Sequence, residues 1–521
     1  AGGQTLSNIG DISAPDIRLF VVSGSIAFKT SSPLVAVRAC WLGSTLATLD
    51  IADNAAYAAG KPLVITPGAW VIDSDVTLAS NLKVLQGVDL QVATLTTLTI
   101  NGTLDIGLHR IFSCIGIGKV VLPVTAIAYP QWWGTNVTAS VNAALASGAG
   151  VVDLGSDTYV AATTVLWDIS KCAMRGNGAK FDAKANPGIG ISVYNDSIAL
   201  SHYTFLKRRS GGFEIEGDRT TNAASVGMEL GSNVSTNTAG FHLENVVIHN
   251  FNINLHFNPD EWAEDWFACT FDKLSLYDAN YGVKAVYGGE RNYFNECSIH
   301  DNVHGFYVNQ GNWTLSNCNI DHNHSRSIHA ENAARVDMKG GHLESQFDDD
   351  YWLYCTGGST MIRLSQTSIT NSAGPKTYEI GLADQCGALG IVLDGVSLEG
   401  GFTAATYGLD NLVKVTDYTG NVSFKGMQPF ISSDGLPTTE TSRLMLSSHL
   451  NYLLDGGYEE ASIAPDWTAS SGAGYDAPVL DAVEFHGSAQ SLQFAPAAGN
   501  QTQIIRSIPC RVGEWGRMTF W

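Results

Sequence analysis

One short pattern recurs along the middle of the chain and restricts what the chain can fold into. Each copy opens with an apolar residue, continues with a polar one and ends in an apolar pair at alternate positions. The clear copies are Leu243–His249, Phe271–Tyr277, Phe294–His300 and Leu315–Asp321, whose first residues are 28, 23 and 21 positions apart. A weaker copy begins another 21 residues on, at Val336, and further copies begin at Leu364 and Leu393.

Repetition at roughly 20 to 30 residues is typical of solenoids, in which each unit buries its apolar face by stacking on the next. Within each copy, strand-forming residues alternate with polar ones, and the gaps are rich in Asn, Gly, Asp and His. Short strands joined by tight turns fit this composition. The repeats therefore predict an all-β protein, a parallel β-helix.

Successive side chains of a strand face opposite ways, so the aligned copies can be sorted by face. The predicted inward set is Val246, Ile248, Leu274, Leu276, Cys297, Ile299, Cys318 and Ile320. The predicted outward set is Lys273, Ser275, Tyr277, Glu296, Ser298, His300, Asn317, Asn319 and Asp321, with His249 and His342 at its ends. A second strand follows each turn, and its outward set is His256, Lys284, Tyr307 and His329, followed by Asn309 and Glu331.

The copy at Val336 breaks this rule. With Val336 aligned to the other first residues, Lys339 and Gly341 take inward positions. A lysine and a glycine fill an apolar column poorly, so this alignment leaves the register of the copy open.

Composition excludes several classes of function. The 521 residues carry a formal net charge of −21 with no long basic block, so nucleic acid is not expected as a partner. No stretch approaches the roughly 20 apolar residues of a membrane span, and no signal peptide is expected at the amino terminus. Nine cysteines without CxxC pairs predict free thiols, with Cys297 and Cys318 as small apolar residues of the core.

Upstream of the repeats, short apolar strands alternate with turn residues from Lys61 onward, and short helices are expected near 46–59 and 137–146. The run Tyr129-Pro-Gln-Trp-Trp-Gly134 precedes the second helix, and Gly150-Val-Val-Asp-Leu followed by Thr158-Tyr-Val comes after it. This arrangement resembles the entry to the pectate-lyase-like right-handed parallel β-helix of bacteriophage tailspikes. Where many relatives carry Gly-Asp-Gly-x-x-Asp-Asp after the Trp-Gly, this chain has Thr135-Asn-Val-Thr.

The resemblance implies a division of the chain into five parts. The expected parts are a connecting segment (1–60), a small β-rich entry domain (61–128), a right-handed parallel β-helix with the substrate groove (129–431), a linker (432–453) and a C-terminal β-sandwich (454–521). The last part resembles the start of a jelly-roll carbohydrate-binding module, with a trimerisation domain as the alternative. The resemblance also implies a homotrimer in the virion tail that contacts other phage tail proteins through its N-terminus, binds a bacterial surface polysaccharide and does not insert into membranes.

The outward residues allow two cleavage chemistries. Hydrolysis of a glycosidic bond needs two flanking carboxyl groups, for which Glu296, Asp321 and Glu331 are candidates. β-Elimination next to a uronate needs a base and a neutralising cation. His300 or Tyr277 as the base and Lys273 as the cation fulfil these roles, and the density of His, Tyr and Lys favours elimination.

The remaining outward residues are candidates for sugar binding, because sugars offer apolar ring faces and many hydroxyl groups. These candidates are His249, Lys284, Tyr307, Asn317, Asn319, His329, Glu331 and His342. The cluster Lys207-Arg208-Arg209 could hold an anionic sugar or form a solvated turn. No cofactor is expected, although the carboxylates of 260–265 and 348–350 could bind Ca²⁺.

Three functions are consistent with these residues. The first is a tailspike depolymerase that cuts lipopolysaccharide O-antigen or capsule. The second is a receptor-binding spike without cleavage. The third is a secreted enzyme for plant polysaccharides, which the absence of a signal peptide and the free cysteines disfavour.

Overall fold

A computed structural model gives the structure of the chain. It describes residues 46–196, 209–231, 238–257, 266–286, 289–345, 353–357, 359–371, 380–382, 390–394 and 396–400, together with short strands elsewhere. The chain contains two compact units, residues 1–197 with 208–216 and residues 198–207 with 217–521.

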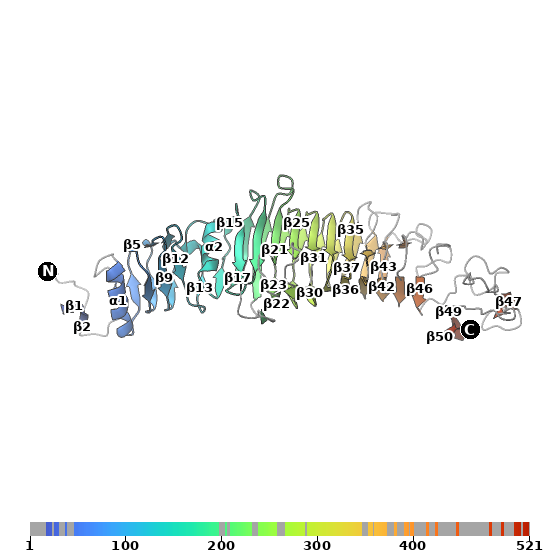
Figure 1. Ribbon diagram of the computed structural model, residues 1–521, viewed down its shortest axis with the longest axis horizontal. Helices are drawn as coiled ribbons and strands as arrows, with labels where there is room; N and C mark the ends of the chain where they lie inside the picture. The colour runs from blue at the N-terminus through green and yellow to red at the C-terminus, as the bar shows by residue number, and fades with distance from the viewer. Residues whose placement is uncertain are drawn as a thin grey trace. The chain divides into compact units, whose positions relative to one another are not determined.

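The first unit contains stacked parallel rungs (Figure 1). Each rung contributes one short strand to each of three sheets, and the inward positions hold apolar residues such as Leu63, Leu82 and Leu90. The first sheet contains β3 (Val37–Arg38), β4 (Leu63–Ile65), β7 (Leu82–Val84) and β10 (Leu104–Ile106). The second contains β5 (Gly68–Ile72), β8 (Val88–Val92) and β11 (Phe112–Cys114), and the third contains β6 (Val76–Leu78), β9 (Thr97–Ile100) and β12 (Lys119–Val121). An antiparallel pair, β1 (Ile17–Val22) and β2 (Ser25–Thr30), precedes them.

The helix predicted near 46–59 is α1 (Leu46–Ala58), which packs at the first rung. Leu49, Ala52 and Ala56 are fully buried on one side of the helix. Asp53 is also buried, and its carboxylate accepts hydrogen bonds of 2.7 and 3.0 Å from the backbone N–H groups of Ala79 and Ser80. The helix thus fixes the turn after β6 as well as burying apolar surface.

The remainder of the first unit contains the second predicted helix. The 3₁₀ helix η2 (Pro130–Trp132) precedes α2 (Thr138–Ala146), and the Trp132 indole donates to the Gly107 carbonyl at 3.1 Å. The strands here are β13 (Ile127–Ala128), β14 (Val151–Asp153), β15 (Thr158–Val160), β16 (Val165–Asp168), β17 (Ala173–Asp182), β18 (Ile189–Tyr194) and β20 (Arg209–Glu216).

The second unit repeats a rung of three strands (Figure 1). First strands are β23 (His242–Glu244), β27 (Thr270–Asp272), β30 (Asn292–Asn295), β33 (Asn312–Ser316), β36 (Arg335–Lys339), β39 (Met361–Ser365), β42 (Gly390–Asp394) and β45 (Val422–Lys425). Second strands are β24 (Val247–His249), β28 (Ser275–Tyr277), β31 (Ser298–His300), β34 (Asn319–Asp321), β37 (His342–Ser345), β40 (Ser368–Asn371) and β43 (Ser397–Gly400). Third strands are β21 (Val226–Leu230), β25 (Ile253–Phe257), β29 (Tyr281–Ala285), β32 (His304–Val308), β35 (Arg326–Glu331), β38 (Leu353–Thr356), β41 (Ile380–Leu382) and β44 (Val413–Val415).

All these strands pair in parallel with the equivalent strand of the next rung, as the repeats predicted. The predicted inward residues are buried, each at most 1% exposed from Val246 to Ile320. Phe271 and Phe294 stack inside the helix with ring centroids 4.7 Å apart. Burying aromatic rings in register on successive rungs contributes to stability and fixes the register.

Two turns in each rung use the left-handed backbone conformation. The first turn lies between the first and second strands, at Asn245, Lys273, Glu296, Asn317 and Gly340, with φ between 52° and 68°. The second follows the second strand, at Asn250, Asp278, Asp301 and His322, with φ between 52° and 62°. Asn and Asp tolerate this conformation better than most residues, which explains part of the Asn and Asp content of the gaps.

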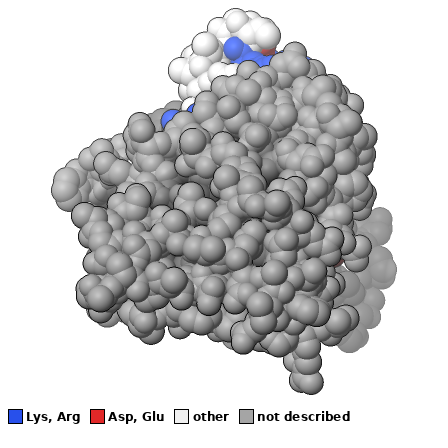
Figure 2. Space-filling model, turned by 90° about the vertical axis from the view of Figure 1, so that its right-hand side faces the viewer, with Lys and Arg blue, Asp and Glu red and all other residues white. Residues whose placement is uncertain are grey.

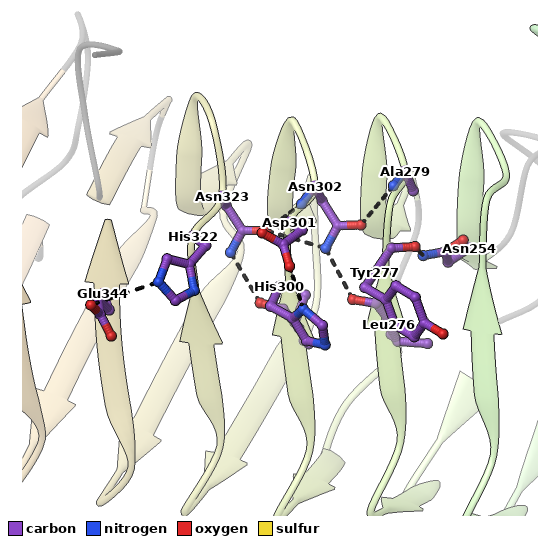
Figure 3. Close-up of polar contacts among 11 residues, drawn as sticks. Asn254, Leu276, Tyr277, Ala279, His300, Asp301, Asn302, His322, Asn323 and Glu344 are labelled. Atoms are coloured by element: carbon purple, nitrogen blue, oxygen red, sulfur yellow. Dashed lines mark hydrogen bonds and ion pairs between the residues drawn. The ribbon is translucent and has the colours of Figure 1, made fainter. Parts of the chain in front are cut away.

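Buried asparagines line the inside of the second turn. The Asn302 side chain accepts from the Ala279 N–H at 3.0 Å and donates to the Leu276 carbonyl at 3.0 Å. Asn323 repeats this one rung later by accepting from the Asn302 N–H and donating to the Ile299 carbonyl (Figure 3). These amides satisfy backbone groups that would otherwise be buried without partners.

The register of the copy after Asp321 differs from the alignment at Val336. Leu315 pairs with Met338, and Asp321 pairs with Glu344. The copy therefore opens at Met338, so Lys339 lies at the exposed end of β36 rather than inward. Gly341 does take an inward position opposite Cys318, and a Cβ there would lie 2.1 Å from the Cys318 carbonyl oxygen.

The structure describes six of the nine cysteines and parts of the C-terminal segment 454–521. Five of the six described cysteines are buried and Cys114 is exposed, and none of the six forms a disulfide. The described part of 454–521 consists of β47 (Val479–Asp481) with β48 (Ser491–Gln493) and β49 (Ile505–Arg511) with β50 (Glu514–Thr519), both antiparallel. The C-terminal β-sandwich and the five-part division remain predictions. The segments 206–208, 258–265 and 346–350 lie outside the described residues.

Among the described residues, no helix has the length and apolar content needed to cross a membrane. Where described residues are in sight in Figure 2, blue Lys and Arg atoms are visible at the surface. Basic side chains are thus accessible on a chain whose formal net charge is −21.

Four other strands of the second unit are short. They are β19 (Thr204–Phe205), β22 (Thr238–Ala239) and β26 (Trp266–Phe267), which form a separate parallel sheet in the second unit, and β46 (Leu444–Ser447), which pairs with β45.

Candidate functional site

The last residues of the second strands form a single outward column. In register they are His249, Tyr277, His300, Asp321 and Glu344, and we call them the first column. Each side chain alternates with a fully buried residue such as Ile299, which holds the column outward. Figure 3 shows Tyr277 and His300 at equivalent places on neighbouring strands, with Glu344 further along the same sheet.

The first part of the column is a stack of aromatic rings. The His249 and Tyr277 centroids lie 4.7 Å apart at an interplanar angle of 9°, and those of Tyr277 and His300 lie 5.0 Å apart at 11°. His249 is only 7% exposed, while Tyr277 and His300 are half-buried. The sequence predicted that these three residues share a face, and the structure brings them into contact.

Asp301 orients the imidazole at the end of this stack. Its Oδ2 lies 2.8 Å from His300 Nδ1 (Figure 3). The left-handed turn at Asp301 directs its carboxylate back toward the strand. A hydrogen bond to a carboxylate on Nδ1 leaves Nε2 as the nitrogen that faces outward, with the tautomer assigned from this contact.

Asp321 follows His300 in the column. Its Oδ1 is buried and accepts no hydrogen bond from any described residue. Burial raises the pKa of Asp321 above its ordinary value, and the nearby imidazole of His342 offsets only part of this effect. A carboxyl group held in this way favours its protonated form.

Glu344 occupies the next position, and sequence reasoning missed it. Its Oε2 lies 3.3 Å from His342 Nε2, and its Oε1 lies 3.7 Å from His322 Nε2 (Figure 3). The Ser368 hydroxyl lies 2.8 Å from His342 Nδ1, so that nitrogen can accept while Nε2–H donates to Glu344. His342 itself lies in the Asn319 column, two positions from the one expected.

A second column runs along the third strands. It consists of His256, Lys284, Tyr307, His329 and Tyr354, and the first four share one register position, as predicted. Its rings pack edge to face, with Tyr307 and His329 centroids 4.6 Å apart and those of His329 and Tyr354 4.8 Å apart. His256 and His329 are buried, at 8% and 7% exposed.

Two cations lie against aromatic rings of the third strands. Lys284 Nζ is 5.0 Å from the centroid of Tyr281, and the Arg326 guanidinium is 3.9 Å from that of Tyr354. Arg326 also contacts His329 Nδ1 at 3.0 Å. Neither cation forms an ion pair with a carboxylate of the described residues.

The groups around these cations have shifted pKa values. Burial, together with Arg326, lowers the pKa of His304 to about 4, so this imidazole is neutral near pH 7. Burial also lowers the pKa of His329. Glu331 has a lowered pKa, chiefly because His329 lies 3.6 Å away and because the Tyr307 hydroxyl donates a hydrogen bond to it. Near neutral pH, Glu331 is therefore a carboxylate and Arg326 and Lys284 are the local cations.

Lys273, Glu296 and Asn317 do not belong to either column. They occupy the left-handed turn between first and second strands, are exposed, and Lys273 forms a 3.6 Å ion pair with Glu296. This turn lies four positions before the first column, a distance of roughly 13 Å along a strand. Asn319 is exposed on β34 two residues before Asp321, and Asn309 bonds to Asn332 at 2.5 Å.

One described group of side chains could hold a metal ion. His242, Glu244 and Asp272 each offer a ligand atom, and these atoms lie within 4.8 Å of one another. The carboxylates of 260–265 and 348–350, for which Ca²⁺ was considered, lie outside the described residues.

Several solved structures are similar to this chain. Among solved structures, the enzymatically active domain of bacteriophage CBA120 tailspike protein 4 is 16% identical with a TM-score of 0.44, over 74% of this chain and 56% of that one. ORF18 of Geobacillus virus E2 is 11% identical with a TM-score of 0.32, over 78% and 67%. Dettilon tailspike protein is 9% identical with a TM-score of 0.27, over 80% and 69%. This chain thus spans little more than half the length of the first of these proteins.

No curated protein sequence matches the chain. Residues 254–397 match the family described as "Right handed beta helix region". This segment contains Tyr277, His300, Asp321 and Glu344, and all of the second column. The chain therefore contains a right-handed parallel β-helix, as predicted, and this helix presents both columns.

Proposed function

We propose that the chain binds and depolymerises a bacterial surface polysaccharide, as part of a phage tailspike. The observation that carries the proposal is the first column, in which stacked rings lead directly to two carboxyl groups on successive rungs. Five rungs about 4.8 Å apart cover on the order of 20 Å, which suits a few sugar units of an extended polymer. The resemblance of the Tyr129–Gly134 region to tailspike β-helices supports the biological setting.

In this proposal, the carboxyl pair cleaves the glycosidic bond by hydrolysis. Asp321 is the general acid, because burial favours its protonated form. Glu344 is the partner carboxylate, because each of its oxygens lies beside an imidazole. The two residues are directly opposite on adjacent rungs, and a rung spacing of about 4.8 Å is close to the roughly 5–5.5 Å between carboxyl groups of retaining glycosidases.

β-Elimination is the second candidate, and one contact favours it. Asp301 holds His300 Nδ1 at 2.8 Å, which leaves Nε2 available as a base beside Tyr277. Lys273, the cation first considered for this reaction, lies at the exposed turn and pairs with Glu296 instead. The base of an elimination is therefore present in the first column without that cation, and we favour hydrolysis.

The second column supports an anionic polysaccharide. Lys284 and Arg326 lie two rungs apart, on β29 and β35, with Tyr307 and His304 on the rung between them. The carboxylate of a sugar bound here would have a cation on either side, and the sugar ring would pack against aromatic rings. The proposed substrate is therefore an acidic O-antigen or capsule.

The proposed assembly is a homotrimer in the virion tail, with the N-terminal segment toward other tail proteins. Exposed apolar residues of the first unit support association with other chains. Leu95, Leu108, Ile117 and Val124 are each at least 60% exposed, which is costly for an isolated chain in water.

Activity of matched variants on purified host polysaccharide tests the proposal. We expect Asp321→Asn and Glu344→Gln each to lower the rate of reducing-end release by about 10² to 10⁴. Asp337→Asn is the control, because Asp337 also faces outward but lies on a first strand. Equal activity of all three variants would refute the assignment of the pair, and no cleavage by the wild-type chain would leave a receptor-binding spike.

A further inference from the structure

A second candidate site lies on the first two rungs of the second unit, away from both columns. His242 and Glu244 lie two residues apart on β23 and therefore face the same way. Asp272 on β27 pairs directly with Glu244 in the parallel register. The strand geometry thus converges one imidazole and two carboxylates on one patch, and their ligand atoms all lie within 4.8 Å.

We propose that His242, Glu244 and Asp272 form a zinc site. Zn²⁺ accepts imidazole nitrogen and carboxylate oxygen in tetrahedral geometry, and three protein ligands leave one position for water. Ca²⁺ fits less well, because it requires six to eight oxygen ligands and this patch supplies one nitrogen in three donors.

The distances in the patch allow the ion to enter with small rotations. His242 Nε2 lies 2.7 Å from Asp272 Oδ2, a hydrogen-bond distance. Two ligands of a tetrahedral zinc ion lie about 3.3 Å apart, given bonds of about 2.0 Å. His242 Nε2 and Asp272 Oδ2 therefore need to move apart by only ~0.6 Å to take a metal in place of the proton between them.

The surroundings of Asp272 support this assignment. Asn295, directly after it in the same column, donates its Nδ2–H to Asp272 Oδ1 at 2.7 Å. This bond holds one carboxylate oxygen and directs the other, Oδ2, toward His242. Hydrogen bonds of this kind orient the ligands of metal sites and raise their affinity. His242 and Asp272 are also partly exposed, at 19% and 28%, so an ion can reach them.

Isothermal titration of the chelator-treated full chain with zinc chloride tests the proposal. We expect one Zn²⁺ per chain, with binding weakened at least tenfold in His242→Ala, Glu244→Gln and Asp272→Asn. Asn295→Ala should weaken it by about 10- to 100-fold, because it releases a ligand without removing it. His109→Ala, which removes an imidazole from the first unit, should bind as the wild type does.

A measurement on the unmodified chain guards against variants that fail to fold. Diethyl pyrocarbonate modifies accessible imidazoles, and mass spectrometry gives the rate at His242. Equimolar Zn²⁺ should slow modification of His242 several-fold, and the same concentration of Ca²⁺ should not. The proposal is overturned if the wild-type chain takes up no stoichiometric Zn²⁺, if the substitutions leave uptake unchanged, or if Zn²⁺ does not protect His242.

Discussion

Replacing Asn302 by alanine should loosen the turn that follows the first column. Asn302 and Ala279 are both 0% exposed, so water cannot replace the lost side-chain partners. The substitution removes the acceptor of the Ala279 N–H and the donor to the Leu276 carbonyl and the Asn323 amide oxygen. An orphaned buried donor costs about 1–3 kcal/mol and each lost bond about 0.5–1.5 kcal/mol, so the expected loss is on the order of 3 kcal/mol.

This loss should be local, because each rung of a solenoid contacts mainly its neighbours. Native-state hydrogen exchange resolved to single amides is therefore the appropriate assay. The informative amides are those of Val303 and His304, which donate to the Ala279 and Asn280 carbonyls and keep these partners in the variant. With tenfold for each 1.4 kcal/mol, their exchange should accelerate by about 10².

Asn280→Ala is the matched control, since Asn280 is exposed in the preceding turn and the one hydrogen bond described for its side chain is to Asn252. Its removal should change the local free energy of opening by at most about 0.5 kcal/mol, or roughly twofold in rate. Equal acceleration in both variants, or none in Asn302→Ala, would refute the reasoning that buried amides hold this turn.

Four further predictions concern the columns and the assembly. Because burial raises the pKa of Asp321, the cleavage rate should decline as pH rises through that pKa. The residual activity of Glu344→Gln should still show this decline in a pH–rate profile, whereas the residual activity of Asp321→Asn should not. The same burial makes the charged form destabilising above the ordinary aspartate pKa, so Asp321→Asn should raise the Tm at neutral pH, measured by thermal unfolding. Lys284→Gln and Arg326→Gln should each raise KM about tenfold on an acidic polysaccharide and leave KM unchanged on its carboxyl-reduced form, with Lys339→Gln as an inert control. Light scattering of the full chain should give three times the mass of one chain, and a monomeric mass would contradict the trimer.

The repeats predicted the fold because period-2 alternation and burial are strictly linked within a strand. Every inward residue predicted from Val246 to Ile320 is buried, and both outward columns share the predicted faces. The alternation does not continue through a left-handed turn, where Lys273 and Glu296 lie. A prediction from alternation alone therefore places Lys273 and Glu296 on the same face as Tyr277 and His300, whereas in the structure they lie in the turn.

Glu344 was missed for a different reason. Rungs in this unit differ in length, and the copy after Leu315 opens at Met338 rather than at Val336. The two alignments differ by two residues, so every side chain keeps its inward or outward direction and alternation cannot tell them apart. The alignment at Val336 puts His342 in the position that Glu344 occupies in the structure. The signal that could have revealed it was steric, because the shift places Gly341 at the inward position beside Cys318, where only glycine fits, and Lys339 outside.

The most direct test of the central claim is the fate of solvent oxygen during cleavage. The host polysaccharide is digested with the wild-type chain in water labelled with oxygen-18, and the products are weighed by mass spectrometry. Hydrolysis by Asp321 and Glu344 predicts one labelled oxygen at each new reducing end, with labelled ends formed about 10² to 10⁴ times more slowly by the Asp321→Asn variant. Unlabelled products that carry an unsaturated terminal sugar, formed equally well by that variant but not by His300→Ala, would contradict the account and assign the reaction to β-elimination.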